Sequence, residues 1–538
     1  MRTIIQNGTI VSDTAAFRAD LLLEDGVVKA VGAGLSAPDA QVIDASGKYV
    51  LPGAVDVHTH MDLQAGAHRA VDDFYTGTVA AACGGTTTIV DHMAFGPKGC
   101  SLWHQVEEYH RLADGKAVID YGFHGVLQHV DERVLREMGE LADREGITSF
   151  KAYLTYDDRL DDGALFQVLR QAKEDGIVIP AHCENDGVVN YLRGWYKAQG
   201  LTQPIYHARS RPARCEAEAV SRLLHLAAMA GEAPVYVVHL SSAAGLAEVR
   251  KARAQRQKGV GVETCTQYLT LTEASYADPQ EGLKAVMSPP LRTQADCDAL
   301  WQGLQDGVID AVATDHCPFH FAVEKQFGAG DFTACPNGAP GVEERLSVLY
   351  SEGVAKGRLS ICELVRLLCA NPSRLYGLYP RKGTLQPGAD ATWSSSTRPS
   401  AAPSPTPGCT RRWITPAMRV WSSRGPLTWC SPAEKWWPGT TSSWASGALD
   451  ATSSGATAAW PNKYKMSAAS KAGGALARMR GAENPRPCGP GVWDARQRSH
   501  FSMRARSWSA NRPRSLLVLP LLWAMTSMSL RPTSSRRW

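Results

Sequence analysis

The sequence has 538 residues, of which 44% are hydrophobic, and this is typical of a soluble globular protein with more than one domain. The net charge of +4 is an average over an acidic body and a basic tail. No stretch reaches the roughly 20 apolar residues that cross a bilayer, so we expect no membrane partner. The start of the chain has no basic stretch before an apolar run, and the 13 cysteines form no CxxC pair. These features predict a cytoplasmic protein with reduced thiols.

Residues 1–52 predict a small β-module ahead of the main domain. Apolar and polar residues alternate at period two in short runs such as TIIQNGTIV, which indicates strands joined by turns. Within DLLLEDGVVKAVG, Asp25-Gly26 is a typical two-residue hairpin turn. We expect these strands to form a β-sandwich together with residues 375–391, which return to the module after the main domain.

From residue 53 to residue 374, apolar β-rich runs alternate with helical patterns. In stretches such as GALFQVLRQAKEDG, apolar residues recur at three- and four-residue spacing, which indicates helices. Eight strands alternating with helices favour an α/β fold of the (β/α)8 TIM-barrel class over an open sheet. The strand candidates are GAVDVHTH, TTTIVDHM, YGFHGVL, ITSFKAYL, IVIPAHCE, VYVVHLS, GVETCTQYL and GVIDAVATDH.

His58 and His60 stand at the end of the first of these strands, where barrel enzymes place their chemistry. At the strand period of two, both side chains point to the same side and can bind one metal ion. A His-x-His pair by itself can also arise by chance. The pair therefore predicts a metal site only when other candidate ligands accompany it.

Lys151 lies among apolar and aromatic residues of the strand candidate ITSFKAYL. A buried ammonium group is costly unless it is paired or modified. One interpretation is a lysine whose charged end reaches solvent at the rim of the sheet. The other is carbamylation by CO2, which converts the amine into a carboxylate able to bridge two metal ions.

His182, His239 and Asp315 end three further strand candidates. Each alone is consistent with a satisfied core or capping residue, and a lone histidine favours that interpretation. Together with the histidine pair and the lysine, they supply ligands for two divalent ions at one end of a barrel. Two such ions lower the pKa of a water molecule and polarise a carbonyl, so the set predicts hydrolysis. We expect Asp315 to bind one ion and to carry a proton from the nucleophile to the leaving nitrogen.

The order of these residues, His-x-His, Lys, His, His and Asp, resembles the metal set of the cyclic amidohydrolases. Within that group, the surrounding sequence is similar to the D-hydantoinase/dihydropyrimidinase family, especially its phenylhydantoinase branch. The similar stretches run in the same order from about residue 50 to residue 350. They are VDVHTHMDLQ, DDFYTGTVAAACGGTTTIVDH, SFKAYLTY, AHCEND, VVHLSS, ETCTQYL, MSPPLR, ATDHCPF and PNGAPGVEERL.

The resemblance implies roles for further residues around the metal set. Tyr156 matches the tyrosine that hydrogen-bonds the oxyanion of the tetrahedral intermediate. Ser288 and Asn337 match residues whose backbone groups hold the cyclic amide ring. Leu63 and the loop around residues 153–159 match the loops that contact the exocyclic substituent of the ring and select its stereochemistry.

The function implied by the resemblance is hydrolysis of 5-monosubstituted hydantoins and dihydropyrimidines, which are small cyclic ureides, to N-carbamoyl amino acids. The family implies two zinc ions bridged by carbamylated Lys151, and a homo-oligomer that is a homotetramer or a dimer. Alternatives are an allantoinase-like hydrolase of another cyclic ureide and a non-catalytic dihydropyrimidinase-related scaffold protein. Tyr156 disfavours an allantoinase, and the complete ligand set disfavours a scaffold. Met61 in place of the arginine that follows His-x-His in dihydroorotases disfavours that group.

The resemblance stops at Ala391, and residues 392–538 differ in composition from the rest. They hold 21 of the 57 Lys and Arg residues but 4 of the 53 Asp and Glu residues, so their charge is +17 against −13 for the preceding part. Their first residues, TWSSSTRP, indicate neither a strand nor a turn. We interpret the segment as an aberrant, disordered basic tail. The rival interpretation is a functional basic tail that binds nucleic acid or an anionic surface. The dispersed Arg residues disfavour it, so we expect no nucleic-acid partner.

The codons possible for residues 391–398 suggest a change of reading frame. Trp has the single codon TGG, and the segment can be written GCG ACC TGG TCG TCT TCG ACC CGG. From the third base, these codons encode Asp-Leu-Val-Val-Phe-Asp-Pro, a strand of the kind the family has at this point. Residues 427–438 allow a second family-like strand in the same frame. We therefore hypothesise a one-base deletion at codons 391–392, which removes strands that would pair with residues 1–52.

Overall fold

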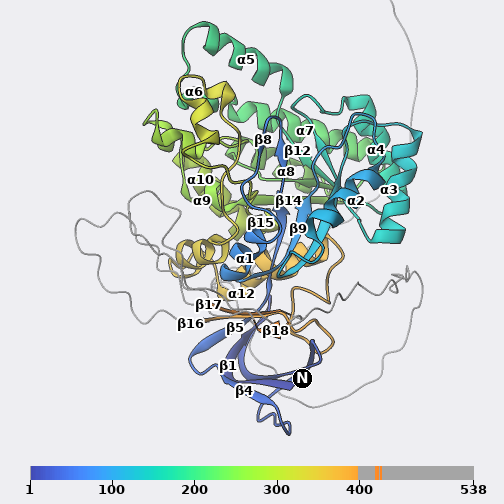
Figure 1. The fold of residues 1–538 in the computed structure, drawn as a ribbon, viewed down its shortest axis with the longest axis vertical. Helices are drawn as coiled ribbons and strands as arrows, with labels where there is room; N and C mark the ends of the chain where they lie inside the picture. Colours follow the sequence, from blue (N-terminus) through green and yellow to red (C-terminus); the bar gives the residue numbers. More distant parts are fainter. Residues whose placement is uncertain (1, 398–417, 423–424, 427–538) are drawn as a thin grey trace, which may run out of the picture. The chain divides into compact units, whose positions relative to one another are not determined.

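The structure is a computed structural model that describes residues 2–397, 418–422 and 425–426 (Figure 1). These residues contain two eight-stranded sheets and one two-stranded hairpin. One sheet consists of parallel strands that alternate with helices, and the other combines the N-terminal strands with strands that follow the barrel. The predicted α/β fold class, a (β/α)8 barrel with a small β-module, is confirmed.

All eight strands predicted for the barrel are present, in the order β6-β9-β10-β11-β12-β13-β14-β15. Each neighbouring pair is parallel. Most strand residues are buried on both faces of the sheet, which explains the continuous apolar runs in the sequence. The strands are β6 (Ala54–Thr59), β9 (Thr86–His92), β10 (Asp120–Val126), β11 (Phe150–Tyr153), β12 (Ile179–His182), β13 (Val235–Val237), β14 (Val260–Cys265) and β15 (Ala311–Ala313).

The barrel closes between its first strand, β6, and its last strand, β15. The amide of Asp315 donates to the carbonyl of His58 at 2.9 Å. The buried side chain of Arg345 crosses the same seam, where Nη1 donates to the carbonyls of Val55 at 2.9 Å and Val312 at 3.1 Å. Closure therefore brings His58 beside Asp315, although the two residues lie far apart in the sequence.

Helices follow the strands, and several of them begin and end at residues suited to those positions. For example, α3 (Glu132–Glu145) begins after Asp131, whose side chain accepts a hydrogen bond from the amide of Val134 at 2.8 Å. It ends at Gly146, where φ is +73°, a left-handed value that strains other residues. The predicted helical stretch GALFQVLRQAKEDG forms α4 (Asp162–Asp175).

The other α-helices are α1 (Thr76–Cys83), α2 (Leu102–Ala113), α5 (Asp186–Ala198), α6 (Ile205–Arg209), α7 (Ala213–Met229), α8 (Ala243–Ala254), α9 (Thr266–Thr270), α10 (Gln294–Gln305), α11 (Arg345–Val348), α12 (Ile361–Val365) and α13 (Asn371–Leu375). The 3-10 helices are η1 (Glu273–Tyr276), η2 (Glu281–Ala285), η3 (Glu324–Gly328) and η4 (Phe332–Ala334). Two π-helical segments follow, η5 (Leu349–Val354) and η6 (Arg366–Ala370).

The second sheet has the order β18-β17-β16-β5-β1-β2-β3, and β4 pairs with β1 off this path. Its β2–β3 hairpin turns at Asp25 and Gly26, which both have positive φ, as the Asp-Gly pair predicts. The sheet has a hydrophobic core of its own that includes Ile5, Leu21 and Trp393. The strands are β1 (Arg2–Val11), β2 (Ala16–Glu24), β3 (Val27–Gly32), β4 (Gln41–Asp44), β5 (Lys48–Pro52), β16 (Trp393–Thr397), β17 (Met418–Ser422) and β18 (Gly425–Pro426). The separate hairpin is β7 (Gln64–Ala65) and β8 (His68–Arg69).

After the barrel the chain returns to the second sheet. The amide of Val28 donates to the carbonyl of Ala389 at 2.8 Å, and the next strand, β16, is antiparallel to β5. The expectation that the sequence from residue 392 forms neither a strand nor a turn is therefore wrong for Trp393–Thr397. Backbone hydrogen bonds to the edge of β5 hold this segment extended, whatever its side chains. The remaining tail residues, 398–417, 423–424 and 427–538, lie outside the described residues. The disorder predicted for the tail concerns these residues and stays a prediction.

Within the part of the chain that the structure describes, no helix has the length and apolar character needed to span a membrane.

Candidate metal centre

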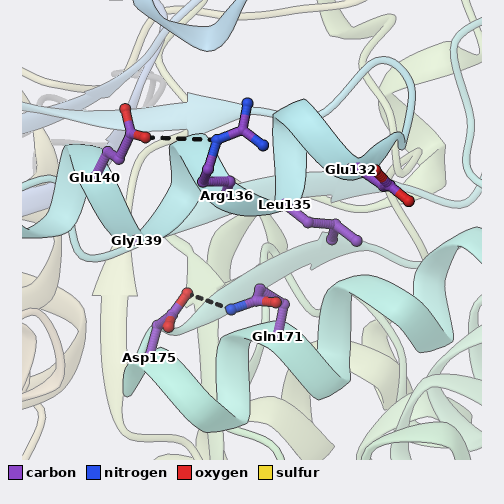
Figure 2. Close-up of a pocket in the computed structure, with 7 residues that line it drawn as sticks. All are labelled: Glu132, Leu135, Arg136, Gly139, Glu140, Gln171 and Asp175. Carbon is purple, nitrogen blue, oxygen red and sulfur yellow. Dashed lines mark hydrogen bonds and ion pairs between the residues drawn. The ribbon is translucent and has the colours of Figure 1, made fainter.

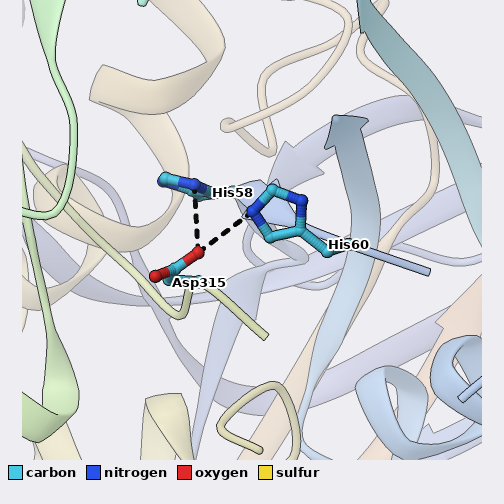
Figure 3. A group of neighbouring side chains, drawn as sticks. All are labelled: His58, His60 and Asp315. Atoms are coloured by element: carbon cyan, nitrogen blue, oxygen red, sulfur yellow. Dashed lines mark hydrogen bonds and ion pairs between the residues drawn. The ribbon is translucent and has the colours of Figure 1, made fainter. Parts of the chain in front are cut away.

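Three of the predicted metal ligands meet at the seam of the barrel. His58 and His60 stand at the end of β6, and Asp315 follows β15 (Figure 3). Oδ1 of Asp315 lies 3.2 Å from Nε2 of His58 and 3.0 Å from Nε2 of His60. One ligand atom from each residue lies within 4.8 Å of the others, so the three side chains can hold one metal ion.

The neighbouring strand fixes the position of His60. Asp91 of β9 accepts hydrogen bonds from Oγ1 of Thr59 at 2.6 Å and from the amide of Met61 at 2.9 Å. These two residues flank His60 in the chain, so one buried carboxyl group holds the chain on both sides of the ligand, through a side chain before it and a backbone amide after it.

Burial and charge set the protonation of these groups. Burial lowers the pKa of His60 to about 4 and the pKa of His239 well below its usual value, so both are neutral, which is the metal-binding form. Burial alone would raise the pKa of Asp315, but the charge of His58 and hydrogen bonds from His58 and His60 lower it well below its usual range. Asp315 is therefore a carboxylate at neutral pH.

Lys151 lies on β11 and reaches the same cluster. Its Nζ lies 3.4 Å from Nε2 of His58 and 5.4 Å from the centre of the Tyr153 ring. The residue is 1% exposed, and burial lowers the pKa of its amine to about 8. Because the side chain is buried to this extent, its charged end does not reach solvent at the rim of the sheet, which was the first interpretation of this lysine. The amine instead lies among the predicted metal ligands.

His182 and His239 extend the cluster. His182 ends β12, whereas His239 lies two residues beyond the end of β13 rather than at the strand end itself. The ring of His239 lies 4.6 Å from the ring of His182 and 5.4 Å from the ring of His58. The structure therefore brings all the predicted ligands together, but only His58, His60 and Asp315 form a group at ion-binding distance among the described residues.

Three predicted site residues have a backbone conformation that side chains disfavour. The φ angle is +79° at Tyr156, +39° at His239 and +54° at Asp315. A left-handed value at a residue other than glycine costs on the order of 1–3 kcal/mol, and such strain concentrates at functional sites. These are three of the nine non-glycine residues with positive φ in the described part of the chain, which supports a functional role for the cluster.

Two buried charged residues that the sequence analysis missed lie behind Tyr156 and His182. Arg211 and Glu184 form an ion pair with each other. The Arg211 guanidinium lies 5.8 Å from the centre of the Tyr156 ring, and Oε2 of Glu184 lies 2.9 Å from Nε2 of His182. Burial raises the pKa of Tyr156, so its hydroxyl keeps its proton at neutral pH. Glu184 follows a predicted ligand closely in AHCEND and could have been found, but no local pattern marks Arg211.

Glu263, on β14, is a third missed residue. Its fully buried carboxylate contacts Nδ1 of His58, and Oε1 also accepts a hydrogen bond from the amide of His239 at 3.2 Å. A carboxylate behind a ligand histidine fixes the orientation and tautomer of the ring. Glu263 lies within the strand candidate GVETCTQYL. A charged residue in an otherwise apolar strand was the feature of the sequence that could have indicated its role.

The residues predicted to hold the substrate lie on loops. Ser288 and Asn337 belong to adjoining segments, because the amide of Gly338 donates to the carbonyl of Val286 at 3.1 Å. Leu63 packs against an apolar group that consists of Ala70, Cys317 and Phe319. This group includes the chain directly after Asp315, so Leu63 belongs to an apolar surface next to the cluster.

The side chains of the cluster fit divalent metal ions. Imidazole nitrogens and carboxylate oxygens are ligands that zinc prefers. Nδ1 of His60 and Nδ1 of His239 are buried without a hydrogen-bond partner. Burial of an unpaired polar atom costs free energy, and a bound metal ion at one of these nitrogens would offset that cost.

A separate groove of about 510 Å³ lies between α3 and α4, on the outer layer of helices (Figure 2). Its polar side chains already pair with one another: Arg136 with Glu140 at 3.6 Å and Gln171 with Asp175 at 2.9 Å. None of the predicted site residues lines this groove, so it has no part in the metal centre.

Comparison with known proteins identifies the family that has this arrangement. The model of the Amidohydrolase family matches residues 49–394. The chain belongs to the amidohydrolase family. It is 52% identical over 391 residues to D-phenylhydantoinases from Escherichia coli O1:K1 and Escherichia coli strain UTI89, and each alignment covers 72% of this chain and 84% of the relative.

This amidohydrolase is also similar to solved structures. A dihydropyrimidinase from Brevibacillus agri has a TM-score of 0.72 and 43% identity, over 73% of this chain and 86% of that chain. A D-hydantoinase has a TM-score of 0.75 and 39% identity, over 79% of this chain and 95% of that chain. The L-hydantoinase (dihydropyrimidinase) from Arthrobacter aurescens has a TM-score of 0.66 and 32% identity, over 73% and 86%. The resemblance to the D-hydantoinase/dihydropyrimidinase family is confirmed, and the chain is a hydrolase that acts on cyclic amides.

Proposed function

We propose that this amidohydrolase opens the cyclic amide bond of 5-monosubstituted hydantoins and dihydropyrimidines to give N-carbamoyl amino acids. The observation that carries the proposal is the meeting of His58, His60 and Asp315 at the seam of the barrel, with the amine of Lys151 only 3.4 Å from Nε2 of His58. The D-phenylhydantoinases that are 52% identical to the chain supply the substrate class.

Two divalent metal ions, zinc in our proposal, would occupy the cluster. The ligands would be His58, His60, Lys151, His182, His239 and Asp315. The Lys151 ammonium would first lose a proton, and reaction of the amine with CO2 would form a carbamate and release a second proton, so an anion would replace the cation next to His58. When bound, the ions would lower the pKa of a water molecule and polarise the ring carbonyl.

Asp315 is placed to move the proton of the reaction. Its carboxylate accepts a proton from the attacking water and delivers it to the ring nitrogen as the carbon–nitrogen bond breaks. The pKa of Asp315, lowered by His58 and His60, keeps the carboxylate ionised before the attack. Its side chain is 14% exposed, so a substrate can reach it.

The loops around the cluster would bind and orient the substrate. The protonated hydroxyl of Tyr156 donates a hydrogen bond to the attacked carbonyl oxygen as negative charge develops there. Backbone groups of Ser288 and Asn337 hold the ring. Leu63 contacts the exocyclic substituent, and its apolar neighbours favour an apolar substituent.

We further propose that the enzyme works in the cytoplasm as a homotetramer or a dimer, with neither nucleic acid nor a membrane as partner. The support for the compartment is the state of the thiols. Most cysteines of the described residues, among them Cys183, Cys265 and Cys335, are free and buried, whereas Cys83 is disulfide-bonded. Reduced cysteines are typical of the cytoplasm.

The proposal is tested by incubating zinc-loaded enzyme with 5-phenylhydantoin or dihydrouracil and measuring the N-carbamoyl product by chromatography. Asp315→Asn should lower kcat by about 10² to 10⁴-fold, because the carboxylate that carries the proton is lost. Asp310→Asn is the matched control. It makes the same change at the opposite end of β15, where Asp310 accepts a hydrogen bond from Arg253 at 2.6 Å. No product from the wild-type enzyme would overturn the proposed function, and a D315N rate near that of the parent would overturn the role of Asp315.

A further inference from the structure

Lys325 is a buried lysine outside the metal cluster. It lies on η3 and is 3% exposed. Its Nζ donates hydrogen bonds to the carbonyl of Val286 at 2.7 Å and to the carbonyl of Pro336 at 2.8 Å. The ring of Phe319 lies 5.8 Å away, and no carboxylate of the described residues forms an ion pair with this ammonium.

The burial of Lys325 is not explained by neutralisation of its charge. The buried Lys382 pairs with two carboxylates, those of Asp120 and Asp390, whereas the partners of Lys325 are uncharged carbonyls. Burial of an ammonium without a counterion is costly, and here it lowers the pKa of the group to about 8. An apolar side chain of similar length would avoid that cost, so the distinct contribution of Lys325 is its pair of hydrogen bonds.

The two carbonyls belong to the segments that carry the predicted substrate-holding residues. Val286 stands two residues before Ser288, and Pro336 directly precedes Asn337. The carbonyl of Val286 also accepts a hydrogen bond from the amide of Gly338 at 3.1 Å. Lys325 therefore joins two loops, distant in sequence, at the point where both reach the site.

We propose that Lys325 is a positioning residue that ties together the two loops that bind the substrate ring. The inference rests on the proposed function, in which backbone groups of Ser288 and Asn337 hold the ring. By bridging Val286 and Pro336, the ammonium sets the spacing between those backbone groups. Loss of the Lys325 ammonium weakens binding of the ring by these backbone groups but leaves the metal ligands and Asp315 in place. We therefore expect KM to rise while kcat changes little.

The test is Lys325→Met in the full-length, zinc-loaded enzyme, with KM and kcat measured for 5-phenylhydantoin. We expect KM to rise about tenfold and kcat to stay within about twofold. Hydrogen–deuterium exchange should become faster in peptides that cover residues 286–289 and 336–338. Lys284→Met is the matched control, because Lys284 lies on the neighbouring η2 and pairs with Glu281 at the surface at 2.6 Å. It should leave KM and exchange unchanged.

The outcomes separate this inference from the proposed function. A wild-type enzyme that opens no cyclic ureide overturns the proposed function and this inference with it. A wild-type enzyme that is active while K325M keeps its KM and its exchange rates overturns the inference alone. A kcat that falls with unchanged KM does the same, because it would place Lys325 in the chemistry. If K325M does not fold, Lys325→Leu, which also lacks an N–H donor, is measured in its place with the same expected direction.

Discussion

Several buried polar atoms of the described residues lack hydrogen-bond partners, and in two regions of this enzyme the lack has different causes. At the ends of the barrel strands, Nδ1 of His60 and Nδ1 of His239 lack partners. In β16 of the small sheet, Nε1 of Trp393 and Oγ of Ser394 also lack partners. The first two atoms belong to a cluster of possible metal ligands, whereas Trp393 lies in a hydrophobic core.

The difference teaches that an unpartnered buried group indicates a site only where other groups of matching chemistry meet it. In β16 no such groups accompany Trp393 and Ser394 among the described residues. There the unpartnered atoms indicate side chains that do not suit their position. This agrees with the hypothesised change of reading frame, which would replace them by the apolar residues of Leu-Val-Val-Phe. The match to the family model also ends close to this point, at residue 394.

The largest effect that can test the contrast between the metal cluster and β16 is expected at Lys151. Lys151→Ala removes the proposed bridge between the ions, so bound zinc and ring-opening activity should be lost together, with partial rescue by short carboxylic acids. Zinc per chain is measured by atomic absorption. Lys382→Ala is the control, because Lys382 is also buried but lies outside the cluster. Its Nζ forms an ion pair with Asp390 at 3.0 Å. Zinc retained at the wild-type level in K151A would contradict the bridging role.

A smaller effect is expected at Glu263, which contacts His58 from behind. Glu263→Gln removes the charge that orients the imidazole, and we expect zinc affinity to fall by about 10 to 100-fold. Competition with a chelating dye measures the affinity. Glu216→Gln is the matched control, since Glu216 is equally buried but accepts hydrogen bonds from Ser241 rather than from a histidine. Equal losses in the two variants would mean that burial of a carboxylate, and not its contact with a ligand, sets the affinity.

Much of the barrel could be predicted, because its strands are buried on both faces and therefore appear as continuous apolar runs. In β9 all seven residues are buried, and the stretch TTTIVDHM predicted this strand. The same pattern predicted that His58 and Asp315 stand near strand ends, and closure of a parallel barrel brings such ends together. The predicted position was less accurate for His239, where the strand ends two residues earlier.

The residues that support the site could not be predicted in the same way. Glu263 acquires its role from His58, Arg211 from Glu184, and Lys325 from two carbonyls, and each of these partners is distant in the sequence or is backbone. A charged residue in an apolar run indicates that something must compensate the charge, but not what. The strand β16 was missed for the opposite reason, because pairing with the open edge of β5 determines its conformation against the preference of its side chains.

The smallest effect, and the one that tests the second region directly, is expected at Ser394. Ser394→Val removes a buried hydroxyl without a partner and adds apolar surface, so it should stabilise the protein by about 1 kcal/mol. Ser373→Val makes the same change where the buried hydroxyl donates to the carbonyl of Cys369 at 2.7 Å, and it should destabilise the protein by a similar amount. Thermal unfolding at a fixed zinc concentration measures both variants, and shifts of opposite sign are expected. A lower Tm for S394V would show that the hydroxyl has a favourable partner, and β16 would then no longer contrast with the metal centre.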